Sequence, residues 1–383
     1  MKIQIVQDVI DLLRNKKGFS IVNHAQKPSN FEDRLKTLIK NCIPYYYTDF
    51  KIEQLYQRQI PDFNEYVYTE QSLIKNIKNY KFAIKELKRR YNINQLKWTY
   101  DNLADGYSRE IFLWVIVHKI LGCGKVRFPL AYSESFDKLD YLNKLKIDNE
   151  ELQGAFSIFN KFNLNKIGYD VKLFTDKIGI IVAYLLEQYA YKNIVKAQEG
   201  DYVIDGGSCY GDISLYFADK VKKNGKVFAF EFVKDNLESF NKNLQLNPQY
   251  KNNIVIVKKA ISGESNQKLY VEGIGPASKI INTAKDGADE VFSITLDDFV
   301  KENQIEKIDF IKLDIEGCEL EALKGAAKIL KQFKPKLAIS IYHKDEDLWQ
   351  IPQYIKSIVP EYDLYIKQLT VVGWETVLYA KCS

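Results

Sequence analysis

Cysteine is scarce in this chain, and no two cysteines form a C-x-x-C pair. The five are widely spaced and odd in number, at Cys42, Cys123, Cys209, Cys318 and Cys382. A secreted protein stabilised by disulfides would have an even number of cysteines at closer spacing. The cysteines therefore favour a reducing, cytoplasmic compartment.

Long apolar runs and a leader segment are lacking as well. The longest apolar run, residues 111–117, is far shorter than the roughly 18 residues that a membrane span requires. The first residues, MKIQIVQDVIDLL, contain neither an apolar stretch of signal-peptide length nor a small-residue cleavage site. We expect a protein without a membrane span.

An excess of charge of one sign is also missing. The 55 basic and 50 acidic residues leave a net charge of +5, which is too small and diffuse to indicate nucleic acid binding. A mild preference for anionic substrates, such as phosphorylated ones, fits this charge equally well. Hydrophobic residues make up 46% of the 383 positions, enough for a sizeable core in two domains or one enlarged domain.

The first part of the chain, residues 1–165, is predicted to be mainly helical and to serve in oligomerisation or acceptor binding. One apolar stripe with helical spacing consists of Leu73, Ile77, Tyr80, Ile84, Leu87 and Tyr91. Such a stripe packs on its own domain or, because it is as narrow as a coiled-coil seam, on a second copy. A further helix is expected over 108–121, with Asp105 or Ser108 as its N-cap, Gly122 at its end and His118 in its core.

Strands and helices alternate from about residue 200. Apolar, β-rich runs occupy residues 202–205, 226–230, 254–258, 309–313 and 336–341, and helical patterns occupy 212–221, 234–246 and 319–333. Several of these runs are almost continuously apolar, as strands buried on both faces are. The alternation predicts an α/β, doubly wound, mostly parallel sheet over residues 166–383. Residues 362–367 and 376–380 would form a closing antiparallel hairpin around Val372-Gly373, and 264–295 an insertion with strands of its own.

A glycine-containing loop follows the first of these strands. The strand ends at Asp205, and Gly206, Gly207 and Ser208 lead toward a helix. Glycines let the backbone approach a ligand closely, and a helix N-terminus presents free N–H groups. The dinucleotide pattern G-x-G-x-x-G fails because Ser208 occupies a glycine position. The spacing D-x-G-x-x-x-G is met instead, with Gly211 as its last residue.

The residues around this loop favour a nucleoside that carries an ammonium group. A carboxylate at the strand tip, Asp205, suits the ammonium group of S-adenosyl-L-methionine and would repel a pyrophosphate. Glu231 ends the next strand and could accept hydrogen bonds from ribose hydroxyls. Phe232 would flank the adenine, and Ala260-Ile261 would form the floor of its pocket. Alone, Glu231 could equally be a solvated acid; together with the loop it favours nucleoside binding.

Four segments of the sequence resemble the FkbM family of S-adenosyl-L-methionine-dependent O-methyltransferases. They are VIDGGSCYGDISLYFA, KVFAFEFVKDN, IDFIKLDIEGCELEALKGA and LAISIYHKDEDLWQIP. Matching blocks run from about residue 188 to the C-terminus, and residues 100–109 are similar to a lead-in segment of some members. The resemblance implies a class I, Rossmann-like methyltransferase fold with a seven-stranded sheet. Family members often methylate sugar hydroxyls, and the sequence is most similar to bacterial capsule-cluster enzymes that act on unusual sugars such as heptoses.

Two further strand ends carry polar groups that could perform the chemistry. Asp314 and Glu316 follow one strand, and His343 and Lys344 follow another. Ligands bind beyond the carboxyl ends of the strands in an open α/β sheet, so these groups can converge. His343 is the candidate general base, since an unperturbed imidazole has a pKa of about 6.5. Asp314 would orient the donor or the acceptor hydroxyl, and Glu316 would bind sugar hydroxyls or fix the tautomer of His343.

Each of these residues has a plainer interpretation. His343 could be a hydrogen-bonded structural residue, and the two acids ordinary polar strand ends. One histidine with two or three carboxylates could also hold Mg²⁺ or Mn²⁺, but no ligand spacing compels it and we expect no metal requirement. Lys344 and Trp349 could meet the diphosphate or ring of a nucleotide-sugar, or be solvated charge and partial core. Cys209 and Cys318 are interpreted as small space-fillers.

The sequence therefore predicts an S-adenosyl-L-methionine-dependent O-methyltransferase, with S-adenosyl-L-homocysteine as product. The acceptor would be a sugar hydroxyl, on a nucleotide-linked sugar or a glycan, in capsule or other surface polysaccharide synthesis. Methylation of nucleic acid is not supported, because Asp314-Ile315-Glu316-Gly317 replaces the D/N-P-P-Y/F motif and no Pro-Cys pair occurs. A nicotinamide-dependent Rossmann oxidoreductase and a non-catalytic nucleoside-binding scaffold are the alternatives.

Overall fold

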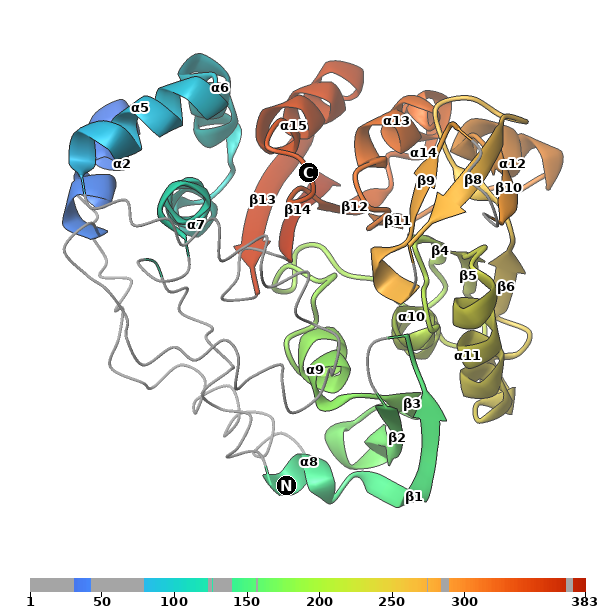
Figure 1. The fold of residues 1–383 in the computed structure, drawn as a ribbon. Coiled ribbons are helices and arrows are strands. Elements are labelled where there is room, and N and C mark those ends of the chain that lie inside the picture. Colours follow the sequence, from blue (N-terminus) through green and yellow to red (C-terminus); the bar gives the residue numbers. More distant parts are fainter. Residues whose placement is uncertain are drawn as a thin grey trace.

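A seven-stranded sheet lies at the centre of the protein, as the computed structural model shows (Figure 1). The structure describes residues 31–42, 79–122, 126, 140–155, 158–273, 275–283, 289–369 and 375–383. The seven strands are β4 (Tyr202–Gly206), β5 (Lys226–Phe230), β6 (Ile254–Val257), β11 (Phe310–Leu313), β12 (Lys336–Ser340), β13 (Tyr362–Gln368) and β14 (Thr376–Cys382). Their order is β13-β14-β12-β11-β4-β5-β6.

Strand direction in this sheet changes at one strand only. The neighbours from β12 through β11, β4 and β5 to β6 pair in parallel, whereas β14 pairs antiparallel with both β12 and β13. The carboxyl ends of five strands therefore meet at one edge, where a ligand can bind. The predicted turn at Val372-Gly373 lies outside the described residues.

Both faces of the sheet are buried because successive side chains point to opposite sides. Val203 and Phe310 pack on one face, and their neighbours Ile204 and Ile311 pack on the other. The first face is covered by α10 (Asp212–Val221) and α11 (Lys234–Gln245). The second face is covered by α12 (Leu296–Glu302), α13 (Glu319–Lys324), α14 (Ala327–Phe333) and α15 (Asp347–Ile358).

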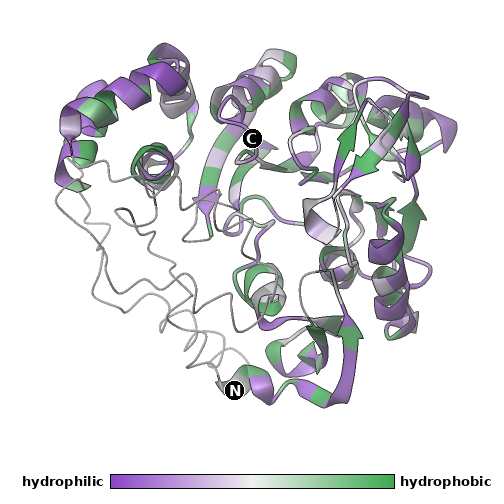
Figure 2. Ribbon diagram, in the orientation of Figure 1, coloured by the Kyte–Doolittle hydropathy of each residue, from purple (hydrophilic) through white to green (hydrophobic). Residues whose placement is uncertain are grey.

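The described N-terminal helices belong to the same hydrophobic core as the second face of the sheet. They are α2 (Phe31–Cys42), α5 (Tyr80–Arg90), α6 (Ile93–Asn102) and α7 (Gly106–Leu121). Figure 2 shows both hydrophobic and hydrophilic residues on helix α7, whose residues 111–117 are continuously apolar and which packs against β13 as well as against other helices. The carboxylate of Asp105 caps this helix by accepting the N–H of Ser108 at 2.7 Å, and Gly122 ends it with a φ of 78°. His118 is buried in it.

The predicted apolar stripe packs inside the chain wherever the structure describes it. Leu73 and Ile77 lie outside the described residues. Leu87 and Tyr91 are buried, and Tyr80 and Ile84 pack against the same core that includes α2 and α7. This matches the first of the two interpretations of the stripe, packing within its own domain.

A small sheet that the sequence did not predict precedes the central one. Its strands β1 (Lys146–Gln153), β2 (Ile158–Asn163) and β3 (Lys172–Thr175) pair antiparallel in that order, and α8 (Asp140–Asn143) precedes them. Residues 1–165 are therefore not helical throughout. The division after residue 165 falls within the 3₁₀ turn η3 (Leu164–Ile167), between β2 and β3. Helix α9 (Lys177–Gly179) then continues into the π-helical turn η4 (Ile180–Leu185).

The predicted insertion does form strands. β8 (Lys268–Glu272), β9 (Lys279–Ile281) and β10 (Glu290–Ile294) join β7 (Ala260–Ile261) in a four-stranded sheet of order β7-β10-β8-β9. Two short 3₁₀ turns, η5 (Pro248–Tyr250) and η6 (Gly275–Ala277), complete the described elements. Among the described residues, no helix is both long and apolar enough to cross a membrane.

Candidate active site

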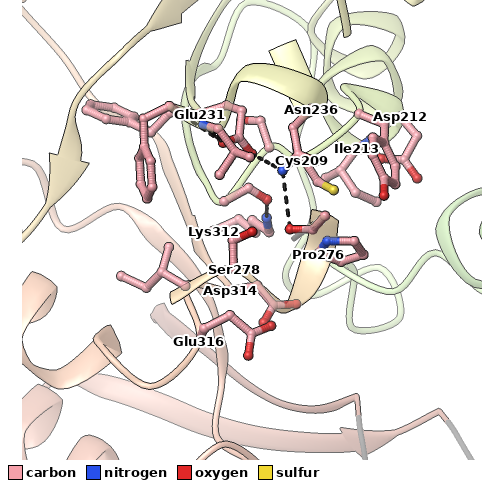
Figure 3. Close-up of a pocket in the computed structure, with 18 of the residues that line it drawn as sticks. Cys209, Asp212, Ile213, Glu231, Asn236, Pro276, Ser278, Lys312, Asp314 and Glu316 are labelled. Atoms are coloured by element: carbon pink, nitrogen blue, oxygen red, sulfur yellow. Dashed lines mark hydrogen bonds between the residues drawn. The ribbon is translucent and has the colours of Figure 1, made fainter. Parts of the chain in front are cut away.

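A cavity of about 420 Å³ lies at the carboxyl ends of β4, β5 and β11 (Figure 3). This volume falls within the range of roughly 300–1,000 Å³ that is typical of ligand pockets. Figure 3 shows Glu231 and Asn236 at one end, Asp314 and Glu316 at the other, and Lys312 between them. The wall also includes Ser278 from the insertion. The predicted cofactor region, the strand end at Asp314 and Glu316, and the predicted insertion thus all contribute residues to the same cavity.

The glycine loop is held in place by the protein's own packing. Gly207 has a φ of 80°, and a Cβ atom there would lie 1.9 Å from the carbonyl oxygen of Asp314. Gly211 has a φ of 78°, and its Cβ would lie 2.1 Å from the ring of Phe240. A Cβ on Gly206 would meet the side chain of Leu313 at 2.8 Å. The glycines therefore allow the loop to approach β11 and α11, and not only a ligand.

Asp205 lies beneath the loop and does not line the cavity. Its carboxylate pairs with the ammonium group of Lys312 at 3.0 Å and accepts the hydroxyl of Ser214 at 2.6 Å. Lys312 in turn donates to the carbonyl oxygens of Gly206 at 2.9 Å and Gly207 at 2.7 Å. Burial lowers the pKa of Lys312, but the charges of Asp205, Asp314 and Asp212 together outweigh burial and raise that pKa.

The predicted contact between Asp205 and a ligand's ammonium group is therefore corrected. The pattern placed the carboxylate at the strand tip, but could not show that a lysine on β11 neutralises it inside the protein. Asp205 instead positions the loop, because it holds Lys312 against the loop carbonyls.

Glu231 faces the cavity from the end of β5 in a fixed orientation. Its Oε1 atom accepts the N–H groups of Phe232 at 2.6 Å and Val233 at 2.7 Å, and its Oε2 atom accepts the amide of Asn236 at 3.1 Å. Burial raises the pKa of Glu231, and these hydrogen bonds partly offset that rise. Carboxylate oxygens have further acceptor capacity, so ribose hydroxyls can still donate to them.

The other residues predicted for the cofactor surround this acid. Phe232, Ser208, Ala260 and Ile261 all line the cavity. Phe232 packs beside the small apolar cluster of β7, β8 and β10 that includes Ala260. This end of the cavity combines an acid that accepts hydrogen bonds with apolar walls, as an adenosine would require.

Asp314 is the central acid at the opposite end. Its Oδ2 atom accepts the hydroxyl of Tyr189 at 2.8 Å, and its Oδ1 atom accepts that of Tyr342 at 3.0 Å. Burial raises the pKa of both tyrosines well above their usual value, so they remain donors. Glu316 follows on a turn with a φ of 56° and also lines the cavity.

His343 lies behind Asp314 and Glu316 and does not line the cavity. Burial lowers the pKa of its imidazole, but the carboxylates of Glu316 and Glu319 outweigh burial and raise it to about 11. With that pKa the ring carries its proton at pH 7 and cannot accept one. The prediction of a general base assumed an ordinary pKa, and the three surrounding acids, including Asp314, remove that basis.

The two residues suggested for the substrate are engaged elsewhere. The ammonium group of Lys344 donates to the carbonyl oxygen of Gly317. Trp349 lies on α15, half-buried against the core, with its ring edge-on to Tyr91 at a centroid distance of 6.3 Å. Neither lines the cavity. For both, the plainer interpretation of solvated charge and partial core agrees with these contacts.

Several residues of this site were not predicted from the sequence. Burial raises the pKa of Glu375 to about 8, with the charge of Asp314 adding to the rise, and Gln188 donates to its carboxylate. Both line the cavity, as does Lys312. Lys312 left a signal, because a lysine inside the apolar run of β11 must find a buried partner. Cys209 also lines the cavity, and burial raises the pKa of its thiol well above its usual value, which fits a space-filling role.

One family model matches part of the chain. Residues 200–368 match the family model of the methyltransferase FkbM domain. No curated protein sequence matches the chain.

Three solved structures show the range of similarity. Methyltransferase FkbM from Methylobacillus flagellatus KT is 20% identical, with a TM-score of 0.48, over 76% of this chain and 58% of that one. This chain thus spans less than two thirds of that structure's length. Fibrillarin from Aeropyrum pernix, in complex with natively bound S-adenosyl-L-methionine, is 11% identical over 60% of this chain and 99% of its own, with a TM-score of 0.34. A putative rRNA methylase from Clostridium thermocellum is 14% identical over 49% and 89%, with a TM-score of 0.32. Residues 200–368 of this chain therefore form a methyltransferase domain of the FkbM family.

Proposed function

We propose that this protein binds S-adenosyl-L-methionine and transfers its methyl group to a hydroxyl group of a sugar. The observation that supports this most directly is that one cavity joins two chemically different ends. Glu231, Phe232 and Ala260 form an end suited to adenosine, and Asp314 and Glu316 form an acidic end suited to a hydroxyl-bearing acceptor.

The reaction needs little from the protein beyond alignment and removal of one proton. The acceptor oxygen forms a bond to the methyl carbon while the carbon–sulfur bond breaks, and that electron pair remains on sulfur as a thioether. Holding the oxygen in line with this bond supplies much of the rate. The hydroxyl proton passes to the acidic end of the cavity, where Asp314 and Glu316 line the wall, and not to His343, which does not line it.

The acceptor that we propose is a nucleotide-linked sugar, such as a heptose, used in capsule or other surface polysaccharide synthesis. The resemblance of the sequence to capsule-cluster enzymes and the net charge of +5 support this choice. The cysteines, few, widely spaced and odd in number, support a cytoplasmic location, where nucleotide-sugars are made. S-Adenosyl-L-homocysteine would be the second product.

A nicotinamide oxidoreductase remains the second candidate because it shares the α/β architecture. Ser208 occupies a glycine position of the dinucleotide pattern, and its hydroxyl donates to the backbone carbonyl of Asp205 at 2.9 Å. The side chain of Ser208 therefore fills the space beside the loop at a position where the dinucleotide pattern has a glycine. A scaffold that binds a nucleoside without reacting is the third candidate, and the ordered acids at the far end of the cavity argue against it.

Transfer of a labelled methyl group tests the proposal. The chain is incubated with labelled S-adenosyl-L-methionine and a panel of nucleotide-activated sugars, free sugars and polysaccharide. We expect label on a nucleotide-activated sugar and about tenfold or greater loss of cofactor affinity in Glu231→Gln, since hydrogen bonds to a charged group contribute about 1.5–3 kcal/mol. Glu238→Gln, an exposed change on α11, is the matched control and should leave transfer intact. Label on none of the sugars would contradict the proposal.

We further propose that the N-terminal part of the chain, residues 1–165, contributes to acceptor binding or self-association. The described helices of this part pack on the sheet's own core, which counts against a seam between copies along these helices. Light scattering of the full chain tests the second role, and a monomeric mass at all concentrations would count against it.

A further inference from the structure

The imidazole ring of His343 is enclosed by three carboxylates. Its Nε2 atom lies 3.5 Å from Asp314 Oδ1 and 3.6 Å from Glu316 Oε2, and its Nδ1 atom lies 3.0 Å from Glu319 Oε1. The side chain of His343 is only 9% exposed, and that of Glu319 is fully buried. Such a concentration of negative charge in a buried place requires a positive partner.

The buried groups of this cluster lack hydrogen-bond partners. Within the described residues, neither ring nitrogen of His343 has one, and neither does the Oε2 atom of Glu319. The 3.0 Å approach of Nδ1 to Glu319 lacks the direction of a hydrogen bond. A buried polar atom without a partner costs about 1–3 kcal/mol, so the arrangement favours an occupant that satisfies several of these atoms at once.

The distances around Nε2 fit two ligands of one metal ion better than two hydrogen bonds. Charge-assisted hydrogen bonds measure about 2.7–2.9 Å, which is well below the observed 3.5 and 3.6 Å. Ligands bound to one ion at about 2.0–2.2 Å lie roughly 3–3.6 Å from each other. One ligand atom each of Asp314, Glu319 and His343 also lies within 4.8 Å of the others.

We propose that a divalent cation of the Mn²⁺ or Mg²⁺ kind binds between His343, Asp314 and Glu316, and that it displaces the imidazole proton to solvent, because a ligating histidine is neutral. Carboxylate oxygens suit these ions, and a single imidazole is compatible with Mn²⁺ in particular. The charge of Glu319 lies 3.0 Å from the opposite ring nitrogen and adds to the negative field that favours a cation. This assignment revises the expectation that no metal is required.

The surroundings hold the ligands in place and supply no competing cation. The hydroxyls of Tyr189 and Tyr342 donate to Asp314. The N–H groups of Ile315 at 2.8 Å and Gly317 at 3.3 Å donate to Glu319. The two nearby lysines of the described chain are engaged elsewhere, Lys312 with Asp205 and the loop carbonyls and Lys344 with the carbonyl of Gly317.

The ion would face the acceptor, because Asp314 and Glu316, two of its proposed ligands, line the cavity. A cation held there would polarise the acceptor hydroxyl and lower its pKa. This role rests on the proposed function, whereas the binding of the ion does not.

Binding of Mn²⁺ by the full-length chain, freed of metal with EDTA and dialysed, tests the proposal. Electron paramagnetic resonance measures free Mn²⁺ during a titration. We expect one bound ion per chain, which Mg²⁺ displaces. Glu316→Gln changes a side chain that is 34% exposed, so the fold should survive, and should weaken binding tenfold or more. His343→Gln should do the same.

Glu321→Gln is the matched control, because this exposed acid on α13 pairs with Lys324 and faces away from the cluster. It should bind Mn²⁺ as the unchanged chain does. No saturable Mn²⁺ binding by the unchanged chain, or equal binding by all variants, would overturn the proposal. Calorimetry with S-adenosyl-L-homocysteine on the same samples separates the two claims: cofactor binding without Mn²⁺ binding overturns the metal site alone.

Discussion

The ion pair between Asp205 and Lys312 lies wholly inside the protein, with the two side chains at most 1% exposed. The pair fixes the glycine loop relative to β11, because Lys312 binds the loop carbonyl oxygens as well as Asp205. The pair therefore links the nucleoside end of the cavity to the acidic end. Neither partner needs to touch a ligand for the loop to depend on it.

Asp205→Asn should destabilise the protein by about 3–5 kcal/mol. The change leaves the ammonium group of Lys312 buried without its counter-charge, which costs far more than the pair itself contributes. The free energy of unfolding in urea measures the loss. The double variant Asp205→Asn/Lys312→Met should recover part of it, because it removes the isolated charge. A single variant as stable as the unchanged chain would contradict this account of the loop.

Gly207→Ala should be far more damaging than Gly200→Ala. Both glycines have a positive φ, of 80° and 86°, which costs an alanine roughly 1–2 kcal/mol. A Cβ on Gly200 meets nothing within 4 Å, whereas one on Gly207 lies 1.9 Å from the carbonyl oxygen of Asp314. The Gly207 variant must therefore shift the loop and lose cofactor affinity as well as stability. Equal losses in urea denaturation and in calorimetry with S-adenosyl-L-homocysteine would show that the close approach does not matter.

Single residues could be predicted where the sequence pattern indicates the direction in which a side chain points. Glu231, Phe232 and Ala260 follow buried strands, and all three line the cavity. Contact of these residues with a ligand stays a prediction. The roles of Asp205 and His343 could not be predicted from the sequence. Asp205 pairs with Lys312, which is distant in the sequence, and His343 is surrounded by three acids. The raised pKa of His343 follows from its acidic neighbours and not from its residue type.

Among the elements, the central strands were the easiest to predict. The runs that form β4, β5 and β11 are apolar except for Lys226 at the start of β5 and for Asp205 and Lys312, which pair with each other. β1 was not predictable, since its sequence KIDNEELQ is polar and almost wholly exposed. A strand with so little buried surface leaves no apolar period to read.

The helix predicted over residues 319–333 is interrupted at Gly325, and the cause is tertiary. A Cβ on Gly325 would lie 2.4 Å from the carbonyl oxygen of Ser262, so the chain passes close to β7 there. The carboxylate of Asp297 then accepts the N–H groups of Lys328 and Ile329 at 3.0 Å, which satisfies the first turn of α14. The helical period continues across this break, and so the sequence alone predicts one helix.

Helix α5 is tied to the loop after β12, which carries His343. Arg90 donates to both carboxylate oxygens of Asp345 at 2.8 and 3.0 Å, and the hydroxyl of Tyr91 donates to the same acid at 2.9 Å. Lys119 of α7 donates to the carbonyl oxygen of Tyr342 at 3.2 Å. The N-terminal helices thus position the segment on which Tyr342 and His343 lie.

Arg90→Ala should lower the free energy of unfolding by about 2 kcal/mol. The bidentate pair is partly buried, with side chains 21% and 24% exposed, so the loss lies below that of a fully buried pair. Urea denaturation measures it. Arg89→Ala is the control, because Arg89 is 65% exposed and pairs within α5 with Glu86. If the two variants unfold alike, the link between α5 and the loop contributes nothing.

For the whole molecule, the N-terminal helices and the methyltransferase domain form one structure. Residues from α2, α5 and α7 belong to the same buried cluster as β12, β13 and α15. The methyltransferase fold was predictable from strand alternation and the FkbM-like segments, but this joint core was not. Packing between distant parts of a chain leaves no local pattern in the sequence.

The central claim is that the cavity binds S-adenosyl-L-methionine, and titration calorimetry tests it most directly. The full-length chain is titrated separately with S-adenosyl-L-homocysteine and with NADH. The account predicts saturable binding of the first at one molecule per chain, weakened at least tenfold in Glu231→Gln and unchanged in Glu238→Gln, with no binding of NADH. Tight binding of NADH without binding of S-adenosyl-L-homocysteine would contradict it.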